Sequence, residues 1–173
     1  MPNAKSNHAK GGAALAVKET QTLQCAADNL FRSAAECCRQ QARIGRVLDL
    51  NCGEDELEAV IEVSVLCVRI LNESAERYWA LGSGSRDGLD EATWHAANAL
   101  WHASREYARR HLSCNVKSAK MSRHSAAQLG ELAIEYELKA SAVLALRYAV
   151  EQYHKVHPEA VGGAIATSAG GST

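Results

Sequence analysis

Apolar residues recur along this chain at steps of three and four, the spacing that places side chains on one face of an α-helix. Four such stretches follow one another, and short polar segments separate them. Pro2 and Pro158 are the only prolines, so no proline between them breaks a long helix. The pattern predicts an all-α protein of four long helices in an antiparallel, up-down-up-down bundle.

The first helix is expected over about residues 15–50, and its seam alternates steps of four and three, as in coiled-coil-like packing. Gly53 follows it, where a helix C-cap prefers glycine. The second helix is expected from Glu54 or Asp55 to about Leu81, because acidic residues in a first turn favour the helix dipole. The two predicted inner stripes comprise Leu23, Ala27, Leu30, Ala34, Cys37, Gln41, Ile44 and Leu48, followed by Leu57, Val60, Ser64, Cys67, Leu71, Ser74, Tyr78 and Leu81.

A third helix is expected from Asp90, a good N-cap, to about Leu112, and a fourth from about Ser122 to His154. The inward positions predicted on the third helix are Ala97, Trp101, Ser104 and Ala108, and those on the fourth are Leu129, Ala133, Tyr136, Ala140, Val143, Arg147 and Val150.

These helices define one domain over residues 14–158. Residues 1–13 are polar and contain glycine, and residues 159–173 are small and low in complexity, so both segments are expected to be flexible. The apolar stripes are wide, which leaves open that a second chain completes a pair of helical hairpins. An oligomer is therefore one expectation of the pattern.

Composition narrows the function classes. The net charge of −1 gives no field that would draw the chain to nucleic acid or to an anionic membrane. Five basic residues lie between Arg109 and His124 with no acid among them, and they are interpreted as a helix end and its loop. No apolar run has the length of a membrane span or a signal peptide. We expect a cytoplasmic protein whose six cysteines stay reduced.

Two thiols are predicted to meet in the core. If the first two helices fold back about Cys52, residues whose numbers add to about 104 lie at one height, and Cys37 and Cys67 satisfy that condition. Two buried thiols can bind copper(I) or zinc, or they can pack as small hydrophobic side chains. Both interpretations stay open.

His102 and Glu106 are further candidate metal ligands, because they are one helical turn apart. The alternative places His102 and its neighbour His95 on a partly exposed flank, with Glu106 in a surface ion pair. No Glu-x-x-His motif supports a di-iron centre, and no glycine-rich phosphate loop, G-x-S-x-G or H-E-x-x-H motif is present. The sequence therefore predicts a protein that is not an enzyme.

Several stretches resemble the cytosolic four-helix-bundle copper-storage proteins. They are Gln24-Cys25-Ala26, Ile61 to Cys67, Arg105-Glu106, and Arg109-Arg110-His111. The resemblance implies a four-helix bundle and, in that family, cysteines that line the interior in C-x-x-C and C-x-x-x-C steps to bind many copper(I) ions. This chain has no such step, and only Cys25 and Cys67 stand where the family pattern places a thiol.

The sequence thus leads to two functional hypotheses. The first is a non-enzymatic bundle that serves as an interaction or structural module, through an unknown protein partner or self-association. The alternative is a metal-binding bundle that holds copper(I) or zinc through Cys37 and Cys67.

Overall fold

The computed structural model describes residues 8–50, 53–82, 86, 88–120 and 126–160, and for residues 8–22 and 119–120 it describes the backbone alone. Four helices account for nearly all of them, and the described residues form no strand. The helices are α1 (His8–Asp49), α2 (Glu54–Gly82), α3 (Glu91–Lys120) and α4 (Ala126–Val156). The predicted all-α fold of four long helices is confirmed.

The observed start of α2, Glu54, agrees with the start at Glu54 or Asp55 that the sequence predicts. The main chain carbonyl of Gly53 accepts hydrogen bonds from the amides of Glu56 and Leu57, each at 3.2 Å. Asp90 caps α3 as predicted, since its carboxylate accepts the amide of Thr93 at 3.0 Å.

Two helices are longer than expected. α1 begins at His8 rather than near Leu15, and α3 continues to Lys120, eight residues beyond Leu112. Residues 112–120 contain neither glycine nor proline, so nothing in this polar stretch ends the helix. Of the two segments expected to be flexible, residues 1–7 and 161–173 lie outside the described residues. Residues 8–13 belong to α1, and 158–160 form a short 3-10 turn.

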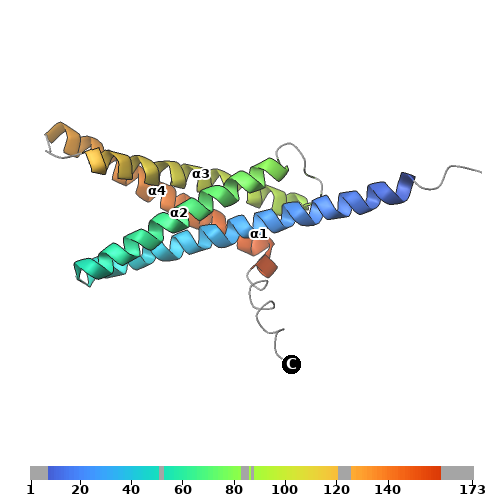
Figure 1. The fold of residues 1–173 in the computed structure, drawn as a ribbon, viewed down its shortest axis with the longest axis horizontal. Coiled ribbons are helices and arrows are strands. Elements are labelled where there is room, and N and C mark those ends of the chain that lie inside the picture. Colours follow the sequence, from blue (N-terminus) through green and yellow to red (C-terminus); the bar gives the residue numbers. More distant parts are fainter. Residues whose placement is uncertain (1–7, 51–52, 83–85, 87, 121–125, 161–173) are drawn as a thin grey trace, which may run out of the picture.

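The helices form two antiparallel hairpins, α1–α2 and α3–α4, which cross each other (Figure 1). They meet at a waist comprising residues 23–37, 67–82, 91–111 and 142–160. On one side of the waist the hairpins diverge, so that the end of α1 and the start of α2 lie well away from the end of α3 and the start of α4. α1 and α3 each contact all three other helices, whereas α2 and α4 do not touch.

The waist holds most of the buried core. Small side chains such as Ala27, Ala34 and Ala97 have no exposed surface, which lets the helix backbones approach closely. Larger buried side chains complete this core. The largest fully buried apolar or aromatic ones are Tyr107, Tyr153, Leu30, Leu71, Leu100 and Leu146.

Polar contacts join the helices across the waist. The Tyr153 hydroxyl at the end of α4 donates to the Asp28 carboxylate on α1 at 2.8 Å, and Gln24 donates to the same oxygen at 3.0 Å. The His157 ring nitrogen lies 3.3 Å from that carboxylate. Between α3 and α2, the Trp101 indole donates a hydrogen bond to the main chain carbonyl of Ala75 at 3.0 Å. These contacts tie each hairpin to the other.

Beyond the waist, each hairpin continues as a two-helix arm. We define the α1–α2 arm as residues 39–50 and 53–66, and the α3–α4 arm as residues 112–118 and 126–141. Only a few side chains are buried in the arms, namely Val47, Val60, Ser64 and Cys114. Five residues predicted on inner stripes are exposed on the arms because no third helix covers them there: Leu48, Leu129, Ala133, Tyr136 and Ala140. Leu81 and Arg147 were also predicted to point inward, and both are exposed outside the arms.

Replacing Leu30 by alanine tests the waist core. Leu30 is fully buried on α1, so the substitution removes packed methyl groups and leaves a cavity. We expect Leu30→Ala to lower the free energy of unfolding by about 2–5 kcal/mol in chemical denaturation. Leu144→Ala is the control, because Leu144 is exposed and its truncation should change stability little. Equal effects of the two substitutions would contradict the waist as the main core.

Candidate functional site

Cys37 on α1 and Cys67 on α2 lie in the same buried core cluster, as the fold-back about Cys52 predicted. Burial raises the pKa of the Cys37 thiol well above its ordinary value, and the neighbouring Cys67 raises it further. The two thiols therefore lie in the same part of the core. Both are neutral thiols at pH 7.

Polar groups surround the two thiols where the waist passes into the arms. Gln41 donates to the Ser64 hydroxyl at 3.0 Å, which links α1 to α2. Burial raises the pKa of the Tyr107 phenol, and both Cys37 and Cys67 contribute to that shift, so Tyr107 shares their layer. The Tyr107 hydroxyl lies close to Ser64, yet it has no well-formed hydrogen bond within the described ranges, and neither has the Ser104 hydroxyl.

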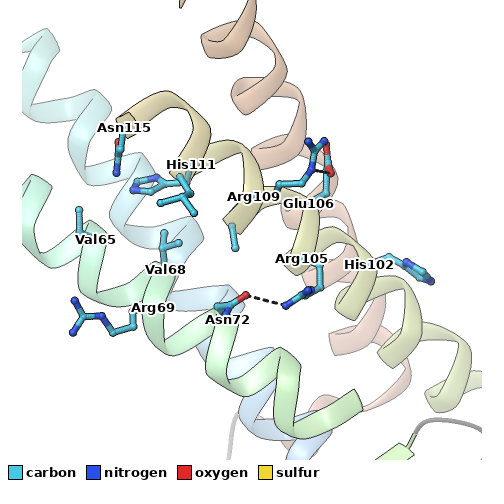
Figure 2. Close-up of a pocket in the computed structure, with 12 residues that line it drawn as sticks. Val65, Val68, Arg69, Asn72, His102, Arg105, Glu106, Arg109, His111 and Asn115 are labelled. Carbon is cyan, nitrogen blue, oxygen red and sulfur yellow. Dashed lines mark hydrogen bonds and ion pairs between the residues drawn. The ribbon is translucent and has the colours of Figure 1, made fainter. Parts of the chain in front are cut away.

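His102 and Glu106 are not brought to the thiols. His102 is exposed, and its ring packs at 4.6 Å on the ring of its neighbour Trp101. The Glu106 carboxylate pairs with Arg109 and Arg110, each at 2.7 Å. Both residues lie on α3 and are among those that line an open cleft between α2 and α3 (Figure 2). The exposure of His102 and the pairing of Glu106 match the flank and the surface ion pair that the sequence left open. Within the described residues, no cluster of three or more His, Cys, Asp or Glu side chains could hold a metal ion.

A cleft of about 820 Å³ lies between α2 and α3, where the hairpins begin to diverge. Its walls are apolar, with Val65 and Val68 on α2 facing Leu112 on α3 (Figure 2). Arginines also line it: Arg69, Arg105 and Arg109. Arg105 is held at 3.2 Å by Asn72, which spans the cleft at its closed end. Glu106 also lines the cleft and pairs with Arg109 at 2.7 Å, and Arg105 lies 3.4 Å from Glu76, so the cleft combines an apolar interior with arginines of which two are paired with carboxylates.

A second groove, of about 670 Å³, lies between α1 and α4. Cys38, Gln41 and Ala42 line it on α1, and Ala140, Val143, Leu144 and Arg147 on α4. Both hollows lie where one hairpin diverges from the other, because no side chain from a third helix fills that space.

His111 on α3 is buried beside the α2–α3 cleft, and its side chain points from α3 toward Val65 and Val68 (Figure 2). Neither ring nitrogen has a hydrogen-bond partner among the described residues. Burial lowers the pKa of His111 to about 4, and the positive charge of Lys139 contributes. The imidazole is therefore neutral at pH 7. The sequence analysis missed this residue as a buried site, although it continues the inward series Ala97, Ser104 and Ala108 by one step.

Comparisons with known proteins found no match: no family model, no curated protein and no solved structure matches the chain. The likeness to copper-storage proteins stays a prediction from the sequence. In the ranges that the structure describes, no helix is both long and apolar enough to cross a membrane.

The buried imidazole of His111 makes stability depend on pH. The unfolded chain binds a proton at His111 below about pH 6.5, but the folded chain does so only below about pH 4. The stabilising contribution is thus complete above pH 6.5 and is lost as the pH falls toward 4. Between pH 7 and pH 5 we expect it to account for about 2 kcal/mol of the loss in unfolding free energy.

His111→Phe should remove this part of the pH dependence in urea denaturation at pH 7 and pH 5, and His102→Phe serves as the exposed control. The comparison with the wild type is needed because Glu36, Glu106 and Glu135 also have lowered pKa values and lose stability in acid. An unchanged slope in His111→Phe would contradict a neutral, buried His111.

Proposed function

We propose that this chain is a non-enzymatic helical-bundle module whose two arms bind another helical protein surface. One observation carries the proposal. Among the described residues, twelve of the eighteen exposed large hydrophobic side chains lie on the arms, and they divide equally between the two. A concentration of exposed apolar side chains on one part of a molecule is typical of protein interaction sites. The twelve are Leu48, Leu50, Ile61, Val63, Val65, Leu66, Leu112, Val116, Leu129, Ile134, Tyr136 and Leu138.

The inner faces of the arms can be identified from the cleft. Val65 on α2 and Leu112 on α3 line it from opposite sides. Ile61 lies one turn before Val65, and Val116 one turn after Leu112, so each continues the same helix face toward the tip of its arm. The opening between the arms is therefore apolar on both walls.

The electrostatics of the thiols support a module that is not an enzyme. Burial raises the pKa of Cys37, Cys67 and Cys114, and it raises that of Cys38 to about 11. A nucleophilic cysteine needs the opposite shift, because the thiolate is the reactive form. These side chains therefore suit packing better than covalent catalysis.

A protein is a better partner for this surface than nucleic acid. The basic side chains of α3 are balanced by carboxylates, since Arg109 and Arg110 pair with Glu106, and Lys117 pairs with Glu135 at 2.7 Å. The five cysteines in the described part are free thiols, which suits the reducing cytoplasm that we propose as the location.

Site-specific photocrosslinking in the expressing cell tests the proposal. p-Benzoylphenylalanine at Tyr136, on the α3–α4 arm, should crosslink to one defined protein after irradiation. The same group at Tyr148, which is also exposed on α4 but lies outside the arms, should give at least tenfold less of that product. Equal or absent protein crosslinks at the two positions would contradict arms that bind a protein.

A second proposed function rests on a different observation: Cys37 and Cys67 are buried thiols in one core cluster. We propose copper(I) as the metal they would bind, because soft thiolates select copper(I). Zinc generally requires four ligands in a structural site. The hydroxyls of Ser64 and Tyr107, the other polar groups placed nearest to the thiols, do not supply the usual nitrogen or sulfur donors. Binding would release protons from both thiols, since both are protonated at pH 7.

An anaerobic copper(I) titration of the reduced protein against a competing chelator tests this second function, with mass determination of the loaded species. We expect one tightly bound ion per chain, lost in Cys37→Ser and in Cys67→Ser. Cys25→Ser is the control because Cys25 is exposed and distant in the fold, and its removal should leave binding intact. Binding that survives both core substitutions would contradict the two-thiol site.

A further inference from the structure

We propose that the α2–α3 cleft binds a small aliphatic carboxylate, with the carboxylate near the closed end of the cleft between Arg69 and His111 and the aliphatic chain directed toward the arms. This ligand site goes beyond the interaction function proposed above, which concerns the apolar surface of the arms, and either can hold without the other. Three observations support it: a gradient of polarity along the cleft, one unbalanced cation, and a buried side chain that lacks hydrogen-bond partners.

The cleft is polar at its closed end and apolar toward its opening. At the closed end, Arg105 on α3 donates to Asn72 on α2 at 3.2 Å. From that contact the two helices run in roughly opposite directions (Figure 1), so seven residues back along α2 and seven forward along α3 bring Val65 opposite Leu112. This apolar pair lies about 10 Å nearer the opening. A molecule with a polar head and an apolar tail therefore fits the cleft in one orientation.

Arg69 is the cation of the cleft that no carboxylate balances. It forms no ion pair or hydrogen bond with any residue that the structure describes. Arg109 pairs with Glu106 at 2.7 Å. Arg105 lies 3.4 Å from Glu76, so the charges of these other two arginines are offset. Because a guanidinium binds a carboxylate through charge-assisted hydrogen bonds, one free arginine favours a ligand with a single negative charge.

His111 gives the cleft a polar group without a partner. The residue is only 6% exposed, it lines the cleft, and its side chain extends from α3 toward Val65 and Val68 (Figure 2). Neither ring nitrogen has a hydrogen-bond partner in the described part of the chain. A buried polar group without a partner costs free energy, and a ligand that supplies the partner recovers it. The neutral imidazole has one N–H, which can donate to a carboxylate oxygen.

The heights of Arg69 and His111 allow both to reach one head group. Three residues along each helix from the Asn72–Arg105 contact, Arg69 stands opposite Ala108. His111 follows Ala108 by three residues, which is about 4.5 Å along the helix axis. Both ring nitrogens are shielded from solvent. A turn of the ring about its Cβ–Cγ bond, a torsion with a broad range of allowed angles, brings one of them to the carboxylate.

The size of the cleft suits a small molecule, but its polar groups distinguish it from the other hollows. Its volume of about 820 Å³ is within the usual range of ligand sites. The hollow between α1 and α2, of about 940 Å³, and the groove between α1 and α4 are comparable in size. Among the described residues, neither of these two is lined by a buried side chain that lacks a hydrogen-bond partner. The α2–α3 cleft is therefore the one we assign to a ligand.

Isothermal titration calorimetry with decanoate, below its micelle-forming concentration, tests the site on the reduced full-length chain. We expect a single saturable site per chain. 1-Decanol has the same chain length and no charge, so it cannot form an ion pair with Arg69. It should bind about tenfold or more weakly than decanoate.

Two substitutions test the head-group contacts. Arg69→Gln should weaken decanoate about tenfold and leave 1-decanol unchanged, because only the charge is lost. Arg77→Gln is its control, since Arg77 is also exposed on α2 but lines the α1–α2 hollow instead. His111→Phe keeps a ring but removes the N–H, and it should also weaken decanoate. His95→Phe is its control, because His95 is exposed on α3 and does not line the cleft.

Methyl NMR locates the bound chain. With ¹³C-labelled methyl groups, the resonances of Val65, Val68 and Leu112 should shift as decanoate is added, because these side chains line the cleft. Leu144 lines the α1–α4 groove and serves as the internal control, so its methyl resonances should stay in place. Circular dichroism of all four variants checks that each keeps the helical fold.

The outcomes separate this ligand site from the interaction function. Saturable decanoate binding that shifts the cleft methyl groups, and that Arg69→Gln and His111→Phe both weaken, supports the site. The absence of saturable binding overturns it, and so does binding that shifts Leu144 instead, that Arg69→Gln leaves unchanged, or that 1-decanol equals. A crosslink from Tyr136 without decanoate binding leaves the interaction function standing alone. Decanoate binding without that crosslink leaves the ligand site standing alone.

Discussion

The close approach of α1 and α3 at the waist is the constraint on which the rest of the structure depends. These two helices lie across the diagonal of the bundle and still touch, because alanines such as Ala27, Ala34 and Ala97 occupy the crossing. Because the diagonal helices α1 and α3 approach each other, the other diagonal pair, α2 and α4, is held apart and makes no contact. The two hairpins must then cross rather than pack side by side along their full length. Beyond the crossing, α1 carries larger side chains such as Gln41 and Ile44, and the hairpins separate.

The polar core layer follows from the same geometry. Cys37, Cys67, Tyr107 and His111 are buried near the level where the hairpins begin to separate, and His111 also lines the cleft between α2 and α3. An unpaired buried imidazole or hydroxyl costs folding free energy. The waist contacts offset that cost, and the result is a layer of uncharged, polarisable groups at the base of the cleft. Within this layer His111 contributes to the acid sensitivity of the fold, and Cys37 and Cys67 are buried thiols of one core cluster.

The sequence predicted the helices and part of the core for clear physical reasons. Helical periodicity, the cap at Asp90 and the acidic first turn of α2 are local signals, and they identified the elements. The fold-back about Cys52 placed Cys37 and Cys67 at one height, because an antiparallel hairpin fixes which residues share a height, and both are buried in one core cluster. Periodicity could not show that Leu48 and Tyr136 are exposed. An apolar stripe indicates which face of a helix is suited to burial, but it does not show whether another helix packs against that face. The burial of His111 depends on the crossing of the hairpins, which no local pattern encodes.

An arm of two helices is marginal by itself, and this links folding of the arms to association. A hairpin of helices buries only the seam between them, and few arm side chains are buried in this chain. Covering an exposed aliphatic side chain stabilises a structure by about 0.8 kcal/mol for each buried methylene. A surface with six exposed large hydrophobic residues on each arm therefore gains much of its stability from whatever covers it. The waist, in contrast, is complete within one chain. Because binding to the folded state alone adds to stability by mass action, the arms should be the part of this molecule whose order depends on its partner, while the waist holds them in position to meet it.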